Sequence, residues 1–265
     1  MRALFIQQDH TSPLGPVGER FAHHGYDLVE FNVVSGENAH APNVTVEFPD
    51  PLSFDLIIPM GAPWSVYDDA TIGNWIGPEL ELLGVAHDAG IPIFGICFGG
   101  QALAAATGGR VQRAPGAEIG WYSVQTDDAD LVGSGPWFQW HYDQFTAPAN
   151  ATTFARTALG PQAFTLGRSL GLQFHPELTA STLDLWLNNG GAESMLSHGL
   201  DPAALLAETQ AGTDEAAART YELVDRFIAR VVPADLVPRV NSPREPGEDP
   251  VEDPVADLIA DEGTS

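Results

Sequence analysis

The alternation of strand-like and helical segments constrains the fold of this chain most. Apolar, β-rich runs lie at residues 3–6, 27–31, 44–48, 55–60 and 92–97, and helical stretches lie at residues 15–24 and about 78–89. A parallel strand pair needs a crossover connection, which is usually a helix. The pattern therefore predicts an α/β fold, a three-layer sandwich with a mostly parallel, flavodoxin-like central sheet.

The spacing of the strand-like segments changes after residue 120. Short runs follow one another at residues 121–126, 152–156, 162–167 and 170–175. The connections between them leave no room for crossover helices, so we expect extra antiparallel strands here.

The C-terminal part is predicted to be helical and then acidic. An apolar stripe at helical spacing indicates a helix that packs on the body and ends at Pro233; it consists of Ala217, Tyr221, Val224, Ile228 and Val231. Residues 233–265 hold nine Asp or Glu and only two Arg. We expect a domain at 1–190, a helical extension at 191–232 and a flexible acidic tail at 233–265, with a partner-docking arm as the alternative for the tail.

Composition excludes several classes of function. Thirty-six acidic residues against 11 basic ones give a net charge of −25, which disfavours nucleic acid and anionic membranes as partners. The sequence has no Lys, so neither a Walker-type phosphate lysine nor a Schiff-base lysine is present. The single Cys, the absence of an apolar signal segment and the lack of a membrane-length apolar run predict a soluble, cytoplasmic protein.

That single cysteine, Cys97, stands where a predicted strand passes into an Ala-rich helix. Gly95 and Gly99 flank it in the G-x-nucleophile-x-G spacing of a sharp strand-to-helix turn. A helix N-terminus favours the thiolate, so we interpret Cys97 as a nucleophile rather than a buried structural cysteine. Gln101 follows one helical turn later on the same face, within reach of a bound substrate.

A thiolate that attacks an amide needs a base, and the base needs a group that orients it. His175 and Glu177 follow an apolar run and are separated by one proline, so their side chains are expected to lie on the same side. We predict that they form this pair. Neither has further His, Cys or Asp ligands at helpful spacing, so no metal and no cofactor are expected.

These motifs resemble the class I, triad-type glutamine amidotransferases, in particular their GMP-synthase-like, stand-alone members. The resemblance covers about residues 1–190 and rests on four ordered blocks: DLIIPMGAP at 55–63, GICFGGQ at 95–101, WHYDQF at 140–145 and QFHPE at 173–177. In relatives, the third block is a loop that lines the glutamine pocket. Ala62 and Tyr142 occupy positions where the family has glycine.

The resemblance implies a role for each matching residue. Cys97 would form a γ-glutamyl thioester, His175 would transfer the proton and Glu177 would orient the imidazole. The oxyanion hole would comprise the backbone N–H of Phe98 and one from the turn at Gly61 and Ala62. The substrate would contact Gln101, His141, Tyr142 and Asp143.

Three functions remain open from the sequence. The favoured one is hydrolysis of glutamine, with delivery of ammonia to an acceptor on a separate synthetase subunit, because the chain has no ATP-activation loop of its own. The alternative is a stand-alone γ-glutamyl hydrolase or peptidase, which needs no partner. A non-catalytic regulatory protein is the third possibility, although such a protein has no need of Cys, His and Glu together.

Overall fold

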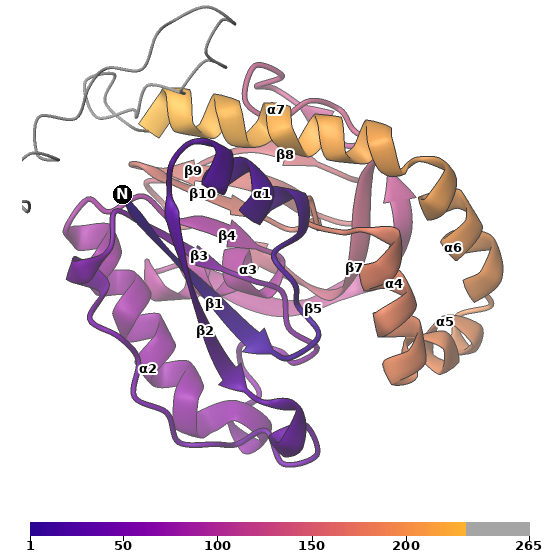
Figure 1. Cartoon of the computed structure of the whole chain (residues 1–265), viewed down its shortest axis with the longest axis horizontal. Coiled ribbons are helices and arrows are strands. Elements are labelled where there is room, and N and C mark those ends of the chain that lie inside the picture. Colours follow the sequence, from indigo (N-terminus) through magenta and orange to yellow (C-terminus); the bar gives the residue numbers. More distant parts are fainter. Residues whose placement is uncertain (232–265) are drawn as a thin grey trace, which may run out of the picture.

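The computed structural model describes residues 1–231 as an α/β sandwich (Figure 1). The predicted acidic tail at 233–265 lies outside the described residues. Within the described part, none of the helices is both long enough and apolar enough to cross a membrane.

The central sheet has the strand order β2-β1-β3-β4-β10-β9-β8-β6, in which a bridge between Ile57 and Ile93 joins β3 to β4. The strands are β1 (Arg2–Asp9), β2 (Asp27–Val34), β3 (Leu56–Pro59), β4 (Phe94–Ile96), β6 (Gln125–Thr126), β8 (Thr152–Arg156), β9 (Pro161–Leu166) and β10 (Ser169–Leu172). Neighbours from β2 to β10 pair in parallel, and those from β10 to β6 pair antiparallel. The predicted parallel sheet with added antiparallel strands is thus confirmed.

Helices cover both faces of this sheet. One layer holds α1 (Gly15–His23) and α7 (Thr213–Val231), and the other holds α2 (Asp69–Asp88) and α3 (Phe98–Ala106). Successive residues of β1 point to opposite faces: Phe5 packs with Phe21 and Phe227, whereas Leu4 belongs to the core around Trp75. The alternation builds two hydrophobic cores, one on each side of the sheet.

A second unit lies beside the carboxyl edge of the parallel strands. Strands β5 (Arg110–Tyr122) and β7 (Trp137–Thr146) pair antiparallel, and helices α4 (Ala180–Trp186), α5 (Ala192–Ser197) and α6 (Pro202–Ala211) lie near them (Figure 1). Ile119, Phe138 and Leu183 belong to the core that joins these helices to the strand pair.

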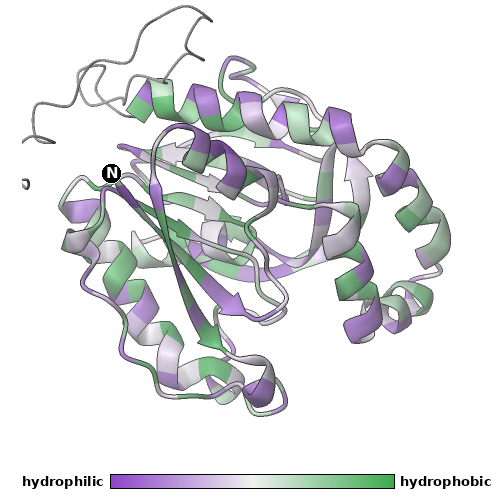
Figure 2. Ribbon diagram, in the orientation of Figure 1, coloured by the Kyte–Doolittle hydropathy of each residue, from purple (hydrophilic) through white to green (hydrophobic). Residues whose placement is uncertain are grey.

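Helix α7 packs on the sandwich with a face slightly different from the predicted one. Val224, Ile228 and Val231 are buried as expected, but Leu223 and Phe227 are buried too. Ala217 and Tyr221 are only partly covered. Hydrophilic and hydrophobic residues alternate along this helix (Figure 2), and Asp214, Glu215, Glu222 and Arg230 are exposed. A bidentate pair between Arg20 and Asp225 ties it to α1.

The strand predicted at 44–48 does not exist. Val44, Val46 and Phe48 do pack against the core beneath α2. The alternation of apolar and polar residues therefore correctly predicted that one side of the segment faces the core. However, the segment is held by contacts with α2, including Trp75 Nε1 donating to Pro42 O at 2.9 Å, and forms no strand ladder. Periodicity alone cannot distinguish these two cases.

The prediction that a helix begins near Pro78 was also wrong, because α2 begins at Asp69. The side chain of Asp68 caps the helix by accepting a hydrogen bond from Thr71 N, and Ile72 and Trp75 are buried before Pro78 is reached. A proline inside a helix removes one backbone hydrogen bond, a cost offset here by apolar burial on both sides of it.

Candidate active site

Cys97 occupies the turn between β4 and α3, as the glycine spacing predicted. Its φ of 50° makes it the only non-glycine residue with positive φ within residues 1–231. A Cβ on Gly99 would lie 2.0 Å from Pro59 O, and one on Gly95 would lie 2.7 Å from Gly99 O. Glycines are therefore required at both positions, so that the helix start can approach the strands and hold the thiol at the carboxyl edge of the sheet.

His175 and Glu177 form a buried pair, with His175 Nδ1 2.7 Å from Glu177 Oε1. Strand β10 ends at Leu172, earlier than predicted, so the segment that carries the pair is held by other contacts. His175 N donates to Phe138 O at 2.8 Å, and Thr220 Oγ1 of α7 donates to Pro176 O at 2.6 Å.

The imidazole of His175 sits between two groups that can be anionic. Burial lowers the pKa of His175, but the charges of Cys97 and Glu177, together with the hydrogen bond to Glu177, raise it well above its ordinary value. Because Nδ1 is engaged by Glu177, Nε2 is the nitrogen left for the thiol and for a substrate. A raised pKa favours the protonated imidazole, which can donate a proton from Nε2.

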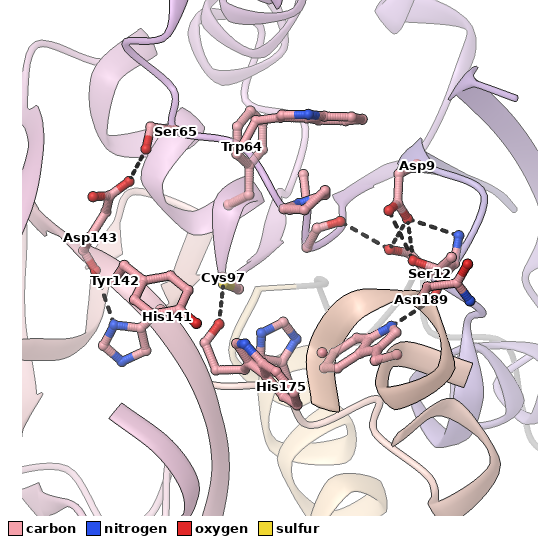
Figure 3. A pocket seen from close by; sticks show the side chains of 18 of the residues that line it. Asp9, Ser12, Trp64, Ser65, Cys97, His141, Tyr142, Asp143, His175 and Asn189 are labelled. Carbon is pink, nitrogen blue, oxygen red and sulfur yellow. Dashed lines mark hydrogen bonds between the residues drawn. The ribbon is translucent and has the colours of Figure 1, made fainter. Parts of the chain in front are cut away.

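A cavity of about 460 Å³ opens beside Cys97 (Figure 3). Most of the residues selected from the sequence line it: Gly61, Ala62, Cys97, Phe98, Gln101, His141, Tyr142, Asp143 and His175. The remaining one, Glu177, stands behind His175. The structure thus brings four distant blocks of sequence to one site.

Phe98 and Ala62, the residues expected to supply the oxyanion donors, both line the cavity beside the thiol. Phe98 is the first residue of α3, so its N–H has no intrahelical acceptor. Ala62 has a φ outside the positive region, so the alanine that replaces the family's glycine introduces no strain there. Glycine is needed at Gly61 instead, because a Cβ would lie 2.8 Å from His175 Cε1.

The block at 140–145 is not a loop, as the resemblance implied, but part of strand β7. It pairs with β5, whose charged residues gave no strand signal in the sequence; Glu118 stands opposite His141 and Arg113 opposite Asp143. The pairing holds the cavity wall on a regular element rather than on a flexible connection.

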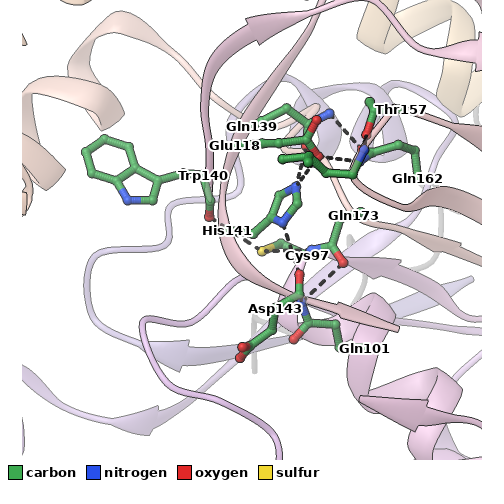
Figure 4. A network of polar contacts seen from close by, with 11 residues as sticks. Cys97, Gln101, Glu118, Gln139, Trp140, His141, Asp143, Thr157, Gln162 and Gln173 are labelled. Carbon is green, nitrogen blue, oxygen red and sulfur yellow. Dashed lines mark hydrogen bonds and ion pairs between the residues drawn. The ribbon is translucent and has the colours of Figure 1, made fainter. Parts of the chain in front are cut away.

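Much of the His141 side chain is engaged in a buried polar network beside the cavity (Figure 4). His141 Nε2 lies 3.1 Å from Gln139 Oε1 and 3.2 Å from Glu118 Oε2, while Nδ1 lies 3.0 Å from Asp143 O. Gln162 Nε2 donates to Glu118 Oε2 at 2.9 Å. Both imidazole nitrogens lie close to oxygen atoms of the protein. His141 therefore stabilises the wall of the cavity rather than offering a free nitrogen to a ligand.

Asp143 and Gln101 also make contacts within the protein. The Asp143 carboxylate accepts hydrogen bonds from Ser65 Oγ and from Tyr67 Oη, the latter at 2.9 Å. Gln101 Nε2 donates to Gln173 Oε1 at 3.2 Å, and Gln173 Nε2 points to Cys97 Sγ at 3.8 Å. These amides form a polar floor beneath the thiol.

Several residues of the cavity were missed in the sequence. They include Asp9, Ser12, Trp64, Arg113, Trp186 and Asn189. Asp9 could have been found, because it ends the first strand at the same sheet edge as Cys97 and ligands collect at such edges. Trp186 packs its ring 5.0 Å from that of His175, a contact without any signal in the sequence.

No group of three or more His, Cys, Asp or Glu in residues 1–231 is placed to hold a metal ion.

A model of the glutamine amidotransferase class-I family matches residues 23–190. The chain belongs to this family. It is 35% identical over 142 residues to the glutamine-hydrolysing GMP synthase of Aeromonas salmonicida, a match that covers 46% of this chain and 25% of the relative. It is 42% identical over 137 residues to the GMP synthase of Prochlorococcus marinus, covering 48% and 24%. The matches thus span about a quarter of the length of these relatives.

Solved structures resemble a larger part of the chain. A glutamine amidotransferase from Thermotoga maritima is 26% identical, with a TM-score of 0.73, over 86% of this chain and 98% of that one. A glutamine amidotransferase from Methylobacillus flagellatus also gives a TM-score of 0.73, over 86% and 94% of the two chains, and at 24% identity it supports the fold alone. The family and the α/β fold expected from the sequence are confirmed.

Proposed function

We propose that this family member hydrolyses the side-chain amide of glutamine at Cys97 and supplies ammonia to an acceptor held by a separate partner. The observation that carries the proposal is the placement of Cys97 beside a His175 whose other nitrogen is held by Glu177 at 2.7 Å. The domain division proposed with it is an amidotransferase unit at 1–190, a helical extension at 191–232 and a tail at 233–265.

In the first half-reaction, the Cys97 thiolate attacks the amide carbon, and the carbonyl electron pair moves onto the oxygen. The N–H groups of Phe98 and Ala62 stabilise this oxyanion. The carbonyl then reforms, the C–N bond breaks, and His175 gives its Nε2 proton to the leaving nitrogen. Ammonia and a γ-glutamyl thioester result.

In the second half-reaction, water attacks the thioester while the now neutral His175 takes one of its protons. Collapse of the second tetrahedral intermediate releases glutamate and restores the thiolate and the imidazolium. Glu177 holds the same imidazole orientation through both steps, which lets His175 act first as acid and then as base.

The coverage of the relatives supports an acceptor outside this chain. The match to the GMP synthase of Aeromonas salmonicida covers 25% of that protein, so most of that protein lies outside the match. Binding of the acceptor would complete the glutaminase site, which limits hydrolysis when no acceptor is present.

The test measures ammonia released from glutamine by the pure protein, in parallel with glutamate released from a γ-glutamyl dipeptide, each with and without cell extract. We expect slow glutamine hydrolysis that the extract stimulates, and a loss of at least about 10³-fold in Cys97→Ala. Rapid dipeptide cleavage that the extract does not change would favour the γ-glutamyl hydrolase instead. Undiminished activity in Cys97→Ala would refute the assignment of the nucleophile.

A further inference from the structure

Ser12, in the loop after β1, touches the turn that lies beside Cys97 (Figure 3). Its Oγ lies 3.0 Å from Gly61 O and 3.0 Å from Asp9 Oδ1. Ser12 and Asp9 are both buried. The role proposed for Cys97, His175 and Glu177 does not use either of them.

The Ser12 hydroxyl has one proton and two acceptors. Asp9 Oδ1 also accepts from Thr11 N at 2.8 Å and from Thr11 Oγ1 at 2.9 Å, which folds the loop around the carboxylate. Gly61 O, in contrast, receives no other hydrogen bond from the described residues. A buried carbonyl without a donor is unfavourable, so the contact to Gly61 is the one that depends on Ser12.

Holding this carbonyl also sets the direction of the next N–H group. The peptide bond between Gly61 and Ala62 is trans, and in a trans peptide the C=O and N–H point in opposite directions. Ala62 N–H therefore points away from Ser12. A Cβ on Gly61 would lie 2.8 Å from His175 Cε1 and 3.8 Å from Cys97 Cβ, so the peptide lies beside the reacting pair.

We propose that Ser12 is a positioning residue, which orients the Gly61–Ala62 peptide so that Ala62 N–H donates to the oxyanion. Asp9 shapes the turn that presents Ser12. Ala62 has no positive φ, so its backbone is unstrained. The hydrogen bond from the Ser12 hydroxyl then fixes the orientation of the Gly61–Ala62 peptide. This inference rests on the proposed function only in assuming that Cys97 attacks an acyl carbon.

The test compares two reactions of the same thiol in Ser12→Ala. Acylation of Cys97 by p-nitrophenyl acetate passes through a tetrahedral oxyanion, whereas alkylation by iodoacetamide does not. Because Cys97 is the only cysteine, subtracting the rate measured in Cys97→Ala isolates the reaction of this thiol with either reagent. We expect acylation to slow by about 10- to 100-fold, less than the loss of a whole oxyanion donor, while alkylation stays within about twofold.

Two further variants complete the experiment. Ser12→Thr keeps the hydroxyl and should keep most of the acylation rate. Ser169→Ala removes another buried serine hydroxyl, one that has no hydrogen-bond partner in the described structure, and should change neither rate. Equal losses of acylation and alkylation in Ser12→Ala, or no loss of either, would overturn the inference. A wild-type protein that acylates but does not hydrolyse glutamine would refute the proposed function and leave this comparison intact.

Discussion

The backbone at Cys97 adopts φ 50° and ψ −107°, a combination that is strained for any residue with a Cβ. The strain persists because Gly95 and Gly99 let β4 and α3 pack closely around it. Only this bend places the sulfur at the first turn of a helix and at the sheet edge together. The reactive position of the thiol is thus obtained at the expense of stability.

This strain can be measured by comparing Cys97→Gly with Cys97→Ala. Both variants lack the thiol and should be inactive, but glycine adopts the positive φ without strain. We expect Cys97→Gly to be more stable than Cys97→Ala by about 1 kcal/mol, after allowing for the greater entropy of glycine in the unfolded chain. Thermal unfolding provides the measurement, and an alanine variant that is equally stable or more stable would argue against strain at this turn.

The pair between His175 and Glu177 predicts a shift in the pH dependence of activity. The Glu177 carboxylate helps to raise the pKa of His175, so the imidazolium persists above its ordinary range. In Glu177→Gln that charge is lost and the pKa of His175 falls. The alkaline limb of the pH–rate profile should therefore move to lower pH, and the maximum rate should fall less than in Cys97→Ala.

Single-turnover rates across the pH range provide this measurement. Glu193→Gln, an acidic position in the first turn of α5, serves as the control and should leave the profile in place. An unchanged alkaline limb in Glu177→Gln would show that Glu177 does not act on the charge of His175.

At the scale of the elements, helix α2 contacts β1 through a buried pair. Gln8 Nε2 donates to Glu79 Oε1 at 2.6 Å, and within residues 1–231 no basic side chain forms an ion pair with this carboxylate. Burial raises the pKa of Glu79 to about 8, and the hydrogen bond from Gln8 offsets this only in part. Glu79 therefore keeps its proton in the folded protein at neutral pH.

The sign of the resulting pH dependence follows from the unfolded state, where Glu79 ionises with its ordinary pKa of about 4.5. Its contribution to stability is fully present below that pH and is lost as the pH rises to about 8, at up to about 1.4 kcal/mol per pH unit. The neutral variant Glu79→Gln removes this loss. We expect its melting temperature, relative to wild type, to rise between pH 5 and about 8.

Glu81→Gln, at an exposed position on the same helix, is the matched control and should show no such trend. If the difference in melting temperature between Glu79→Gln and wild type were the same at every pH, Glu79 would be ionised in the folded protein.

At the scale of the whole molecule, helix α7 closes one of the two cores and reaches the active site. Leu223, Val224, Phe227 and Ile228 are buried with the sheet, and Thr220 donates to Pro176 next to His175. Helix α7 is therefore part of the fold that positions the segment with His175, although the family match ends at residue 190.

Two truncations separate α7 from the residues that follow it. Each of the four buried side chains contributes about 1.5–3 kcal/mol, which together approaches the whole stability of a typical domain. A chain that ends before Thr213 should fail to fold. A chain that ends after Val231 should keep its melting temperature within a few degrees, because residues 233–265 have a composition with little apolar surface to bury. A large loss of stability in the longer chain would contradict that prediction, and circular dichroism checks both.

The features that could be predicted from the sequence are those that depend on residues close together in the chain. The strand alternation, the glycines around Cys97 and the short spacing between His175 and Glu177 are local patterns, each tied to one backbone geometry. They predicted the sheet and the elbow, and with the family resemblance they also predicted nine of the residues that line the cavity. Ambiguity arose where a local pattern fits two structures, as at 44–48, or where a helix crosses a proline, as at Pro78.

Contacts between residues far apart in the chain became known only from the folded structure. The pairing of β5 with β7 converts an expected pocket loop into a strand and turns His141 toward Glu118. Likewise, Ser12 meets Gly61 and Trp186 meets His175 only after the chain has folded. Such contacts follow no periodicity, because they arise where separate elements pack at the sheet edge, and the packing of the whole molecule sets their geometry.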